Sequence, residues 1–318
     1  MAERSRAERG PSASADGLVV VDKPAGWTSH DVVAKVRQLA GTRKVGHAGT
    51  LDPMATGVLI CGVGRATRLL GYLSGHDKSY DATIRLGQST ITDDAQGDTV
   101  AVTPTAGLSD ESVRLAASNF VGTIAQVPSA VSAVKVDGKR AYAKVRAGET
   151  VHLEPRTVTV TELTIRDVRR PTSDVLDVDL RDVDLRDVDV LDVEVTVTCS
   201  SGTYVRAIAR DLGETLGVGG HLTALRRTRI GAVRLRDAKT LHALETDFAV
   251  TDLSDAVRRA FPVRVVSDED AAAVVHGRPV ELAGETGVVG VFDEAGAVLA
   301  LMEPRDGVLR VAAGFIGS

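Results

Sequence analysis

One aspartate on a glycine-rich turn is the residue of this sequence best placed to do chemistry. Asp52 lies in residues 46–53, GHAGTLDP, shortly before an apolar run that begins at Val58. Pro53 fixes the backbone on one side, and the nearby glycines let another backbone approach closely. A carboxylate held in this way is suited to nucleophilic or charge-stabilising chemistry. An isolated Asp-Pro pair, by contrast, usually does no more than cap a turn.

Further polar motifs surround Asp52 in a fixed order. They are DKPAGWTSHD at 22–31, DKSY at 77–80, RLGQ at 85–88, TDDA at 92–95, SGTYVR at 201–206 and LRR at 225–227. Together with the Asp52 segment, these motifs resemble the TruB-type tRNA pseudouridine synthases, the family that isomerises the T-loop uridine of tRNA. The resemblance runs from about Gly17 to about Ile230, so a chance match is excluded.

The resemblance implies an α+β protein with the pseudouridine synthase fold. This fold is a mixed, largely antiparallel β-sheet flanked by helices, with a small β-rich PUA-like domain at the C-terminus. We expect a disordered tail at 1–16, the catalytic domain at 17–252 and the RNA-binding module at 253–318. Residues 174–194 form an acidic repeat that we expect to be an insertion within the catalytic domain.

Three catalytic residues follow from the resemblance. Asp52 matches the family's catalytic aspartate. Arg206 matches the arginine that pairs with it, and a guanidinium there would keep the carboxylate ionised and aimed. Tyr80 matches the tyrosine that stacks on the target base and is a candidate for proton transfer.

The resemblance also implies residues that hold the substrate. His47 matches the histidine that fills the space left by the flipped nucleotide. Tyr204 and Leu225 are expected to line the pocket. Lys23 is counted among the substrate-binding residues and is expected to support the active-site loop. Asp94 matches an acid near the base edge, but Asp93 precedes it, so the sequence leaves open which of the two contacts uracil.

The implied reaction breaks the bond from C1′ to N1, rotates the base and re-forms the bond through C5. It is redox-neutral, so we expect no cofactor and no metal. The partner is the T-arm of tRNA, whose uridine must be extruded before it can react. Whether Asp52 attacks C6 or C1′ is not determined by the sequence.

The charge distribution permits RNA binding despite a formal net charge of −5. Nine acids and two arginines between Asp174 and Glu194 give a local charge of −7, which leaves +2 for the rest of the chain. Basic residues near the motifs predict a basic face. They are Lys35, Arg37, Arg43, Lys44, Arg65, Arg68, Lys135, Lys139, Arg140, Lys144, Arg146, Arg226, Arg227 and Arg229. The repeat itself is expected to be a solvated hairpin extension or loop without a binding role.

Composition also limits the class of protein. No apolar run approaches the roughly 20 residues that cross a bilayer, and the N-terminus lacks a signal core, so we expect a cytoplasmic protein, and a monomer. Cys61 and Cys199 show neither a disulfide nor a zinc pattern.

Periodicity and capping residues predict the elements that carry the motifs. Ser29 is expected to cap a helix that starts at Asp31 and stops at Gly41. Strands are expected at 18–21, 58–63, 79–86, 158–165, 193–198, 288–292, 297–302 and 308–312, and helices at 66–73, 109–120, 204–216 and 267–275. In the strand at 79–86, alternation places Tyr80 on the apolar face.

Other functions fit less well. Residues 62–67 lack the third glycine of a dinucleotide loop, no phosphate loop occurs, and residues 93–98 lack the ligand alternation of a calcium loop. A non-catalytic tRNA-binding or tRNA-folding protein is the main alternative. An RNA N-glycosylase would use similar carboxylate chemistry, and release of free uracil would distinguish it.

Overall fold

The structure is a computed structural model that describes residues 16–129, 135–136, 139–140, 153–171 and 189–316. Its chain forms two compact units, each of which is described by itself. The first unit takes in Met1–Pro53, Val58–Ser74 and Ala232–Ser318, and the second takes in Met54–Gly57 and Gly75–Gly231.

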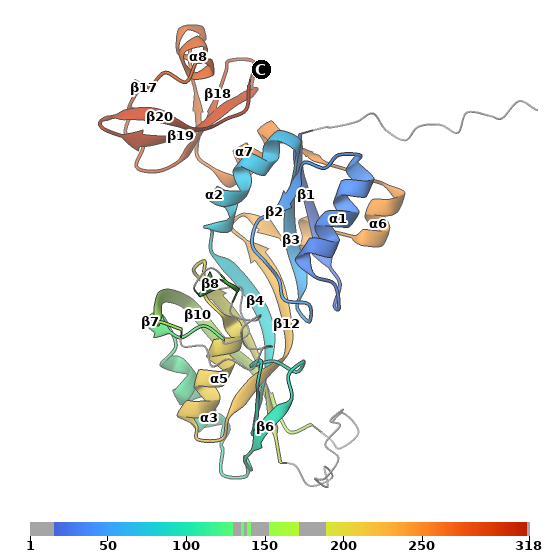
Figure 1. Cartoon of the computed structure of the whole chain (residues 1–318). Helices are drawn as coiled ribbons and strands as arrows, with labels where there is room; N and C mark the ends of the chain where they lie inside the picture. The colour runs from blue at the N-terminus through green and yellow to red at the C-terminus, as the bar shows by residue number, and fades with distance from the viewer. Residues whose placement is uncertain (1–15, 130–134, 137–138, 141–152, 172–188, 317–318) are drawn as a thin grey trace, which may run out of the picture. The chain divides into compact units, whose positions relative to one another are not determined.

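The first unit contains one end of the 11-stranded sheet, formed by strands near the N-terminus and by β14 and β15 (Figure 1). Strand β1 lies between β14 and β3, while β2 pairs antiparallel with β3 and β15 pairs antiparallel with β1. Most residues of β1 and the continuous apolar run of β3 are buried. This burial fixes the register of both strands. These strands are β1 (Gly17–Lys23), β2 (Val45–His47), β3 (Thr56–Val63), β14 (Lys239–Thr240) and β15 (Thr251–Asp252).

Helix α1 (Ser29–Ala40) packs its valines on this sheet and ends, as predicted, at Gly41 with a left-handed φ of 62°. The predicted cap is wrong by one residue. Thr28 caps α1 and forms a reciprocal capping box with Asp31, while Ser29 is the first helical residue and is buried.

The segment predicted as one helix at 66–73 is a 3₁₀ turn followed by a short α-helix. The other helical elements around the sheet are η1 (Gly64–Leu69), α2 (Leu70–Ser74), η4 (Leu235–Asp237), α6 (Leu241–Thr246) and α7 (Leu253–Ala260), and β13 (Val233–Arg234) precedes η4.

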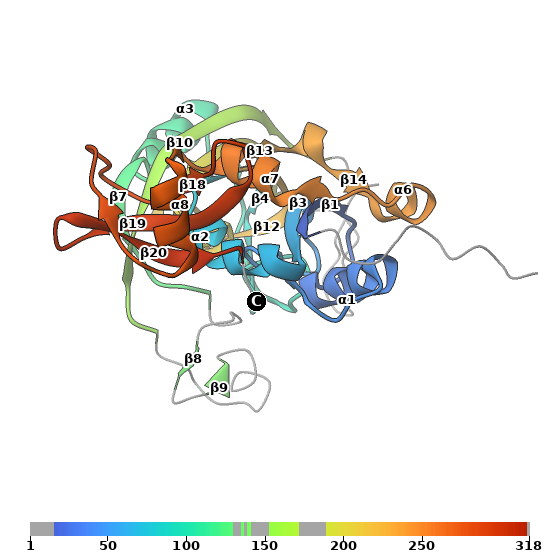
Figure 2. The same ribbon diagram turned by 90° about the horizontal axis from the view of Figure 1, so that it is seen from above.

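The C-terminal part of the first unit is a separate five-stranded sheet in the order β16-β18-β19-β20-β17, with α8 beside it (Figures 1 and 2). Its apolar core includes Val291, Met302 and Leu309, and Ser267 caps α8 as predicted. The β-rich PUA-like character expected of this region is confirmed. Its elements are β16 (Val263–Val265), α8 (Asp268–Val275), β17 (Val280–Glu281), β18 (Val289–Phe292), β19 (Val298–Arg305) and β20 (Val308–Gly314). The domain boundary at residue 252 stays a prediction.

The second unit is built on a sheet in the order β12-β4-β11-β10-β7, all neighbours antiparallel. Helices α3 and α5 lie side by side against it (Figure 1). The α+β class and the mixed, largely antiparallel sheet are therefore confirmed, whereas β12 was not predicted. Its elements are β4 (Lys78–Leu86), β5 (Gln88–Thr90), β6 (Thr99–Val102), α3 (Asp110–Ser118), β7 (Gly122–Gln126), β8 (Lys135–Val136), β9 (Lys139–Arg140), β10 (Arg156–Arg169), β11 (Leu191–Cys199), α5 (Val205–Thr215) and β12 (Gly220–Ile230).

The acidic segment contains one residue that corrects the expectation of a solvated run. Residues 172–188 lie outside the described part, but Asp192 belongs to β11 and is 5% exposed. Its carboxylate accepts two hydrogen bonds from Arg85, at 2.8 and 2.9 Å, across the β11–β4 ladder. Burial with a bidentate partner makes Asp192 a structural residue of the sheet. The predicted tail at 1–16 also lies outside the described residues, apart from Asp16, which pairs with Arg65.

Candidate active site

The residue before Asp52 is fixed by a buried serine. The Ser29 hydroxyl accepts a hydrogen bond from the Leu51 N–H at 2.9 Å and donates one to the Leu51 carbonyl at 3.0 Å. Both groups lie in the interior, where an unmade hydrogen bond is costly. Because Thr28 takes over the capping of α1, Ser29 is available to hold the loop.

The residue after Asp52 is fixed from the other side. The Pro53 carbonyl accepts hydrogen bonds from the Gly26 N–H at 2.9 Å and from the Lys23 ammonium at 3.2 Å. Lys23 is completely buried and also donates to the carbonyls of Trp27, at 2.6 Å, and Pro24, at 3.0 Å. These contacts support the predicted role of Lys23 in holding the loop; contact with substrate stays a prediction.

Asp52 itself is partly exposed on the connection between β2 and β3. The antiparallel pairing of the two strands closes this connection, with His47 opposite Cys61 and the Ala48 N–H bonded to the Ile60 carbonyl at 2.9 Å. Asp52 and His47 are thus carried by one hairpin. The His47 ring meets the His30 ring of α1 edge-on, with centroids 5.7 Å apart.

In the second unit, Tyr80 and Leu225 share one face of the sheet. Tyr80 on β4 lies opposite Arg227 on β12, and Ala82 lies opposite Leu225. Directly opposite residues of an antiparallel pair point to the same side, so Tyr80 and Leu225 are diagonal neighbours. Both are 7% exposed. The expectation that alternation places Tyr80 on an apolar face is confirmed.

Arg206 lies in the first turn of α5, and Tyr204 is the capping residue of that helix. The Gln126 side-chain amide makes two hydrogen bonds to the Tyr204 backbone. It donates to the carbonyl at 3.1 Å and accepts from the N–H at 2.8 Å. Gln126 is buried on β7 and therefore anchors the start of the helix that carries Arg206. No local pattern around Gln126 indicates this role.

The Arg206 guanidinium reaches across the unit to the turn that carries Asp94. Its Nη1 donates to the Thr92 carbonyl at 2.9 Å and to Asp94 Oδ2 at 3.2 Å, and both charged side chains are about 5% exposed or less. Asp94 also accepts hydrogen bonds from Thr92 Oγ1, at 2.6 Å, and from the Gln96 N–H, at 3.0 Å. Pairing of Arg206 with Asp52 stays a prediction.

The neighbouring Asp93 has a different partner. Its backbone has a positive φ of 58°, and its carboxylate lies 3.3 Å from Arg210. Burial raises the pKa of this carboxyl above its usual value, although Arg210 and Arg206 oppose the shift. The carboxylates of Asp93 and Asp94 therefore contact two different arginines, and Asp94 is the one that contacts Arg206.

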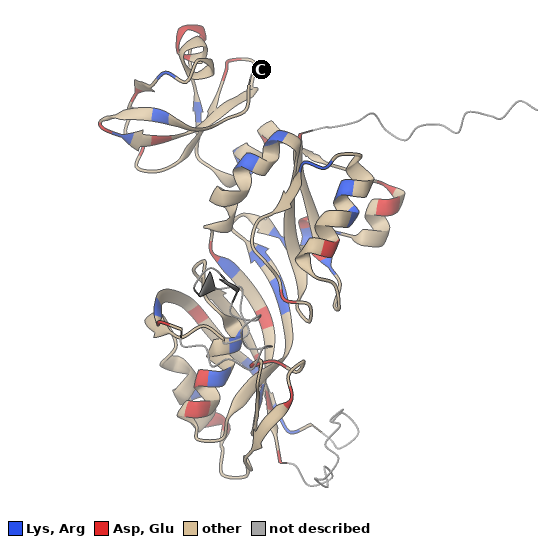
Figure 3. Ribbon diagram, in the orientation of Figure 1, with Lys and Arg blue, Asp and Glu red and all other residues tan. Residues whose placement is uncertain are grey.

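The basic residues expected on one face have mixed environments. Figure 3 shows basic residues along β4 and β12 and on α1. Arg227 is only 1% exposed, so its predicted place on a solvent-facing basic surface is wrong. Arg229 is paired with Asp77, while Arg43 and Lys44 are exposed. The side chains of Lys135, Lys139, Arg140, Lys144 and Arg146 lie outside the described part of the chain.

The described residues include side chains of the kinds that bind metals, and two thiols. No group of three or more His, Cys, Asp or Glu in that part of the chain could hold a metal ion. Cys61 and Cys199 are buried and not bonded to each other, and burial raises the pKa of Cys61 to about 12. No helix in the described ranges is long and apolar enough to cross a membrane.

Comparisons with known proteins match most of the chain. The model of the TruB family pseudouridylate synthase (N terminal domain) matches residues 37–205. The tRNA pseudouridylate synthase B C-terminal domain matches residues 206–261, and the tRNA pseudouridine synthase II C-terminal model matches residues 261–315.

Individual relatives agree with the family models. The tRNA pseudouridine synthase B of Thermobifida fusca is 56% identical over 96% of this chain and 100% of its own length. That of Rhodococcus jostii is 51% identical over 91% of this chain and 90% of its own. Among solved structures, a Cbf5-Nop10-Gar1 complex superimposes with a TM-score of 0.66 at 26% identity, covering 94% of this chain and 85% of the matched one.

Proposed function

Because the chain belongs to the TruB family of pseudouridylate synthases, we propose that it converts the T-loop uridine of tRNA into pseudouridine. Isomerisation of uridine in tRNA is the activity that its relatives support, and the T-arm is the site that we assign. One observation of this chain supports the chemistry most directly. Asp52 lies between two residues whose backbones are held by hydrogen bonds, Leu51 by the buried Ser29 and Pro53 by the buried Lys23 and by Gly26.

The reaction conserves atoms and electrons. The bond between C1′ and N1 breaks, the uracil rotates, and a bond forms between C1′ and C5. The C5 proton is lost, and N1 gains a proton. We assign to Asp52 the covalent or charge-stabilising role at C6 or C1′, since a carboxylate positioned before the substrate arrives avoids the cost of orienting it during the reaction.

The second unit supplies the remaining roles in this proposal. Tyr80 and Leu225, neighbours on one sheet face, form a surface against which a flipped uracil can stack. Arg206 supplies the positive charge that keeps Asp52 ionised, and Asp94 orients Arg206. Tyr204 lines the pocket, and His47 fills the space of the extruded nucleotide.

The protein acts, in this proposal, as a cytoplasmic monomer without a cofactor. A non-catalytic tRNA-binding protein would need neither the clamped Asp52 loop nor the buried Arg206, so catalysis is favoured. The deciding experiment is pseudouridine mapping on unmodified tRNA transcripts incubated with the protein. Pseudouridine at the T-loop uridine is expected. Binding without any pseudouridine would favour the tRNA-folding alternative, and free uracil would favour an N-glycosylase.

A further inference from the structure

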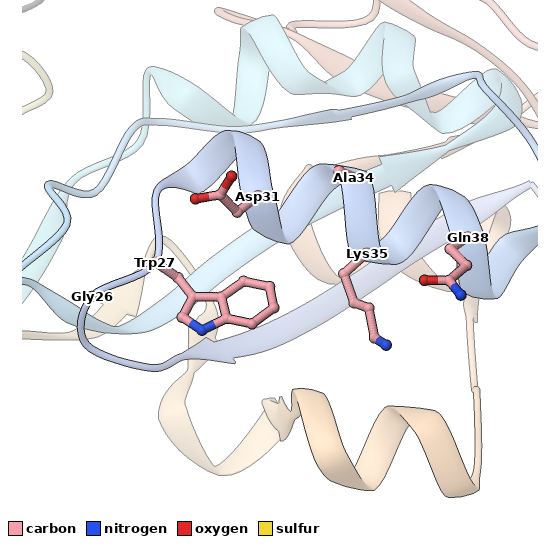
Figure 4. A pocket seen from close by; sticks show the side chains of 6 residues that line it. All are labelled: Gly26, Trp27, Asp31, Ala34, Lys35 and Gln38. Carbon is pink, nitrogen blue, oxygen red and sulfur yellow. The ribbon is translucent and has the colours of Figure 1, made fainter.

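A pocket lies beside α1, next to the loop that supports Asp52. It has a volume of about 510 Å³ and opens widely to solvent. Within it, the Trp27 indole and the Lys35 side chain point to the same side of α1 (Figure 4). The lining residues are Gly26, Trp27, Asp31, Ala34, Lys35 and Gln38.

Trp27 gives this pocket an aromatic wall. It is the only tryptophan of a chain that is 3% aromatic, and it is 37% exposed. Its backbone is fixed on both sides, because its carbonyl accepts a hydrogen bond from Lys23 at 2.6 Å and the next residue, Thr28, caps α1. An exposed indole on a fixed backbone can bind a planar ligand with less loss of conformational entropy than one on a mobile loop.

The helix supplies polar groups beside the indole. Residues 31, 34, 35 and 38 follow the spacing of one helical face. Lys35 is ion-paired with Glu245 on α6, and both side chains are partly exposed, so an anion can displace this weak pair. The Asp31 carboxylate is held at the other end by Thr28, which donates through its N–H at 2.9 Å and its hydroxyl at 2.7 Å.

An aromatic platform beside a cation is the combination that binds unpaired nucleotides: the base stacks, and the phosphate meets the positive charge. The pocket is also coupled to the Asp52 loop. The Gly26 N–H donates to the Pro53 carbonyl at 2.9 Å, and Lys23 bonds to the carbonyls of both Trp27 and Pro53.

We propose that this pocket binds an unpaired nucleotide of the tRNA substrate, with the base stacked on Trp27 and its phosphate at Lys35. The proposal rests on the proposed function, because the ligand is a second nucleotide of the same RNA. The nucleotide would be held by the same loop that positions Asp52, so the pocket would add affinity and help to orient the RNA strand.

The single tryptophan provides a direct test. An unmodified tRNA transcript is titrated into the full-length protein while tryptophan fluorescence is recorded, and pseudouridine formation is measured on the same samples. Stacking of a base is expected to quench the fluorescence of Trp27 and to shield it from acrylamide. Turnover with unchanged fluorescence and unchanged acrylamide access would overturn the pocket and leave the proposed function intact. Quenching and shielding without turnover would refute the function and keep an RNA site at Trp27; absence of both would refute both.

Substitutions then separate binding from support of the loop. Trp27→Ala is expected to weaken tRNA binding by roughly five- to a hundred-fold, whereas Trp27→Phe retains most of the affinity because a ring remains. The loss should appear in the dissociation constant and KM more than in kcat. A loss confined to kcat, with tRNA affinity unchanged, would contradict the pocket and show that Trp27 only supports the loop. Leu115→Ala, which changes a 70% exposed side chain on α3, is the matched surface control.

The phosphate contact has its own control. Lys35→Gln is expected to reduce the slope of log affinity against log salt by about 0.7 to 0.9, the value for one phosphate, and to reduce the quenching at subsaturating tRNA. Lys239→Gln removes the same charge from a lysine that is likewise paired with a carboxylate, that of Asp247, but does not line the pocket, so it should leave both the salt slope and the quenching at subsaturating tRNA unchanged. Equal quenching curves for Lys35→Gln and the unsubstituted protein would exclude Lys35 from the site.

Discussion

The two units hold their functional residues by different kinds of interaction. In the first unit, the hydrogen bonds from Ser29, Gly26 and Lys23 fall on the backbone of Leu51 and Pro53, the neighbours of Asp52. At the Arg206–Asp94 pair of the second unit, the interactions fall on the charged side chains themselves, and the Asp94 carboxylate is engaged by Arg206, Thr92 and Gln96.

This difference separates positioning from chemistry. A loop that is held through the backbones of Leu51 and Pro53 fixes the position of the residue between them, Asp52. A carboxylate that already accepts several hydrogen bonds is better suited to orienting a partner than to attacking a substrate. We therefore assign the reacting role to Asp52 and an orienting role to Asp94, and the following substitutions test that division.

The largest effect is expected at Asp52. Asp52→Asn keeps the size of the side chain and the clamped backbone but removes the charge and the nucleophile. Pseudouridine formation should fall by many powers of ten, toward the uncatalysed rate, while tRNA affinity persists. Single-turnover assays at saturating enzyme, with filter binding alongside, measure both. A folded Asp52→Asn protein with near-normal turnover would falsify the assignment.

The next largest effect is expected at Arg206. Arg206→Met retains much of the buried volume but removes the charge that Asp94 orients, so turnover should fall by at least about a hundred-fold. If Arg206 acts through Asp52, the double variant Asp52→Asn/Arg206→Met should be no slower than Asp52→Asn alone. Additive losses would show that the two residues act independently.

A buried ion pair of the second unit is expected to contribute strongly to the free energy of unfolding but not to catalysis. Asp192→Asn leaves the buried Arg85 without its ionic partner and should lower the free energy of unfolding by about 3 to 5 kcal/mol. Glu194→Gln, two residues along β11, breaks a partly exposed pair with Arg169 and should cost less than about 1 kcal/mol. Urea unfolding measures both, and equal losses would contradict the assigned role of burial.

In the first unit, loss of the serine clamp on Leu51 is expected to have a smaller effect, and that effect should fall on kcat. Ser29→Ala removes both hydrogen bonds to Leu51, and the loosened loop should lower kcat by roughly ten- to a hundred-fold with little change in tRNA affinity. Ser109→Ala removes a capping serine from α3 in the second unit, so it should cost about 1 kcal/mol of stability and leave kcat unchanged. If the two variants turn over equally well, the serine clamp does not position Asp52.

Local patterns predicted much of this fold. Alternation placed Tyr80 on the buried face of β4, and Gly41 marked the end of α1. The cap of α1 was missed by one residue because Thr28 and Ser29 can both cap a helix. The spacing of Thr28 and Asp31 was the available signal, since it matches a capping box.

Contacts between distant parts of the chain could not be predicted in this way. Asp192 looked like one more solvated acid because its partner, Arg85, is 107 residues away and becomes its neighbour only through the register of β11 and β4. Gln126 likewise meets Tyr204 across 78 residues. The candidate residues themselves came from motifs that resemble a family, while the groups that hold them came from the structure.

The smallest expected effect concerns pH and is confined to the second unit. Burial lowers the pKa of His221 below its usual value of 6.5, despite a hydrogen-bonding contact with the Gln88 carbonyl at 3.1 Å. The unfolded chain therefore binds a proton near pH 6.5 that the folded chain does not, so the free energy of unfolding should fall as the pH drops below about 6.5. One such proton limits the slope to about 1.4 kcal/mol per pH unit.

Urea unfolding from pH 8 to pH 5.5 measures the slope of the free energy of unfolding against pH. It should decrease in His221→Gln and remain in a control substitution of the 92% exposed His242. Equal slopes in the two variants would show that the pH response arises elsewhere, His76 being the next candidate because burial lowers its pKa too.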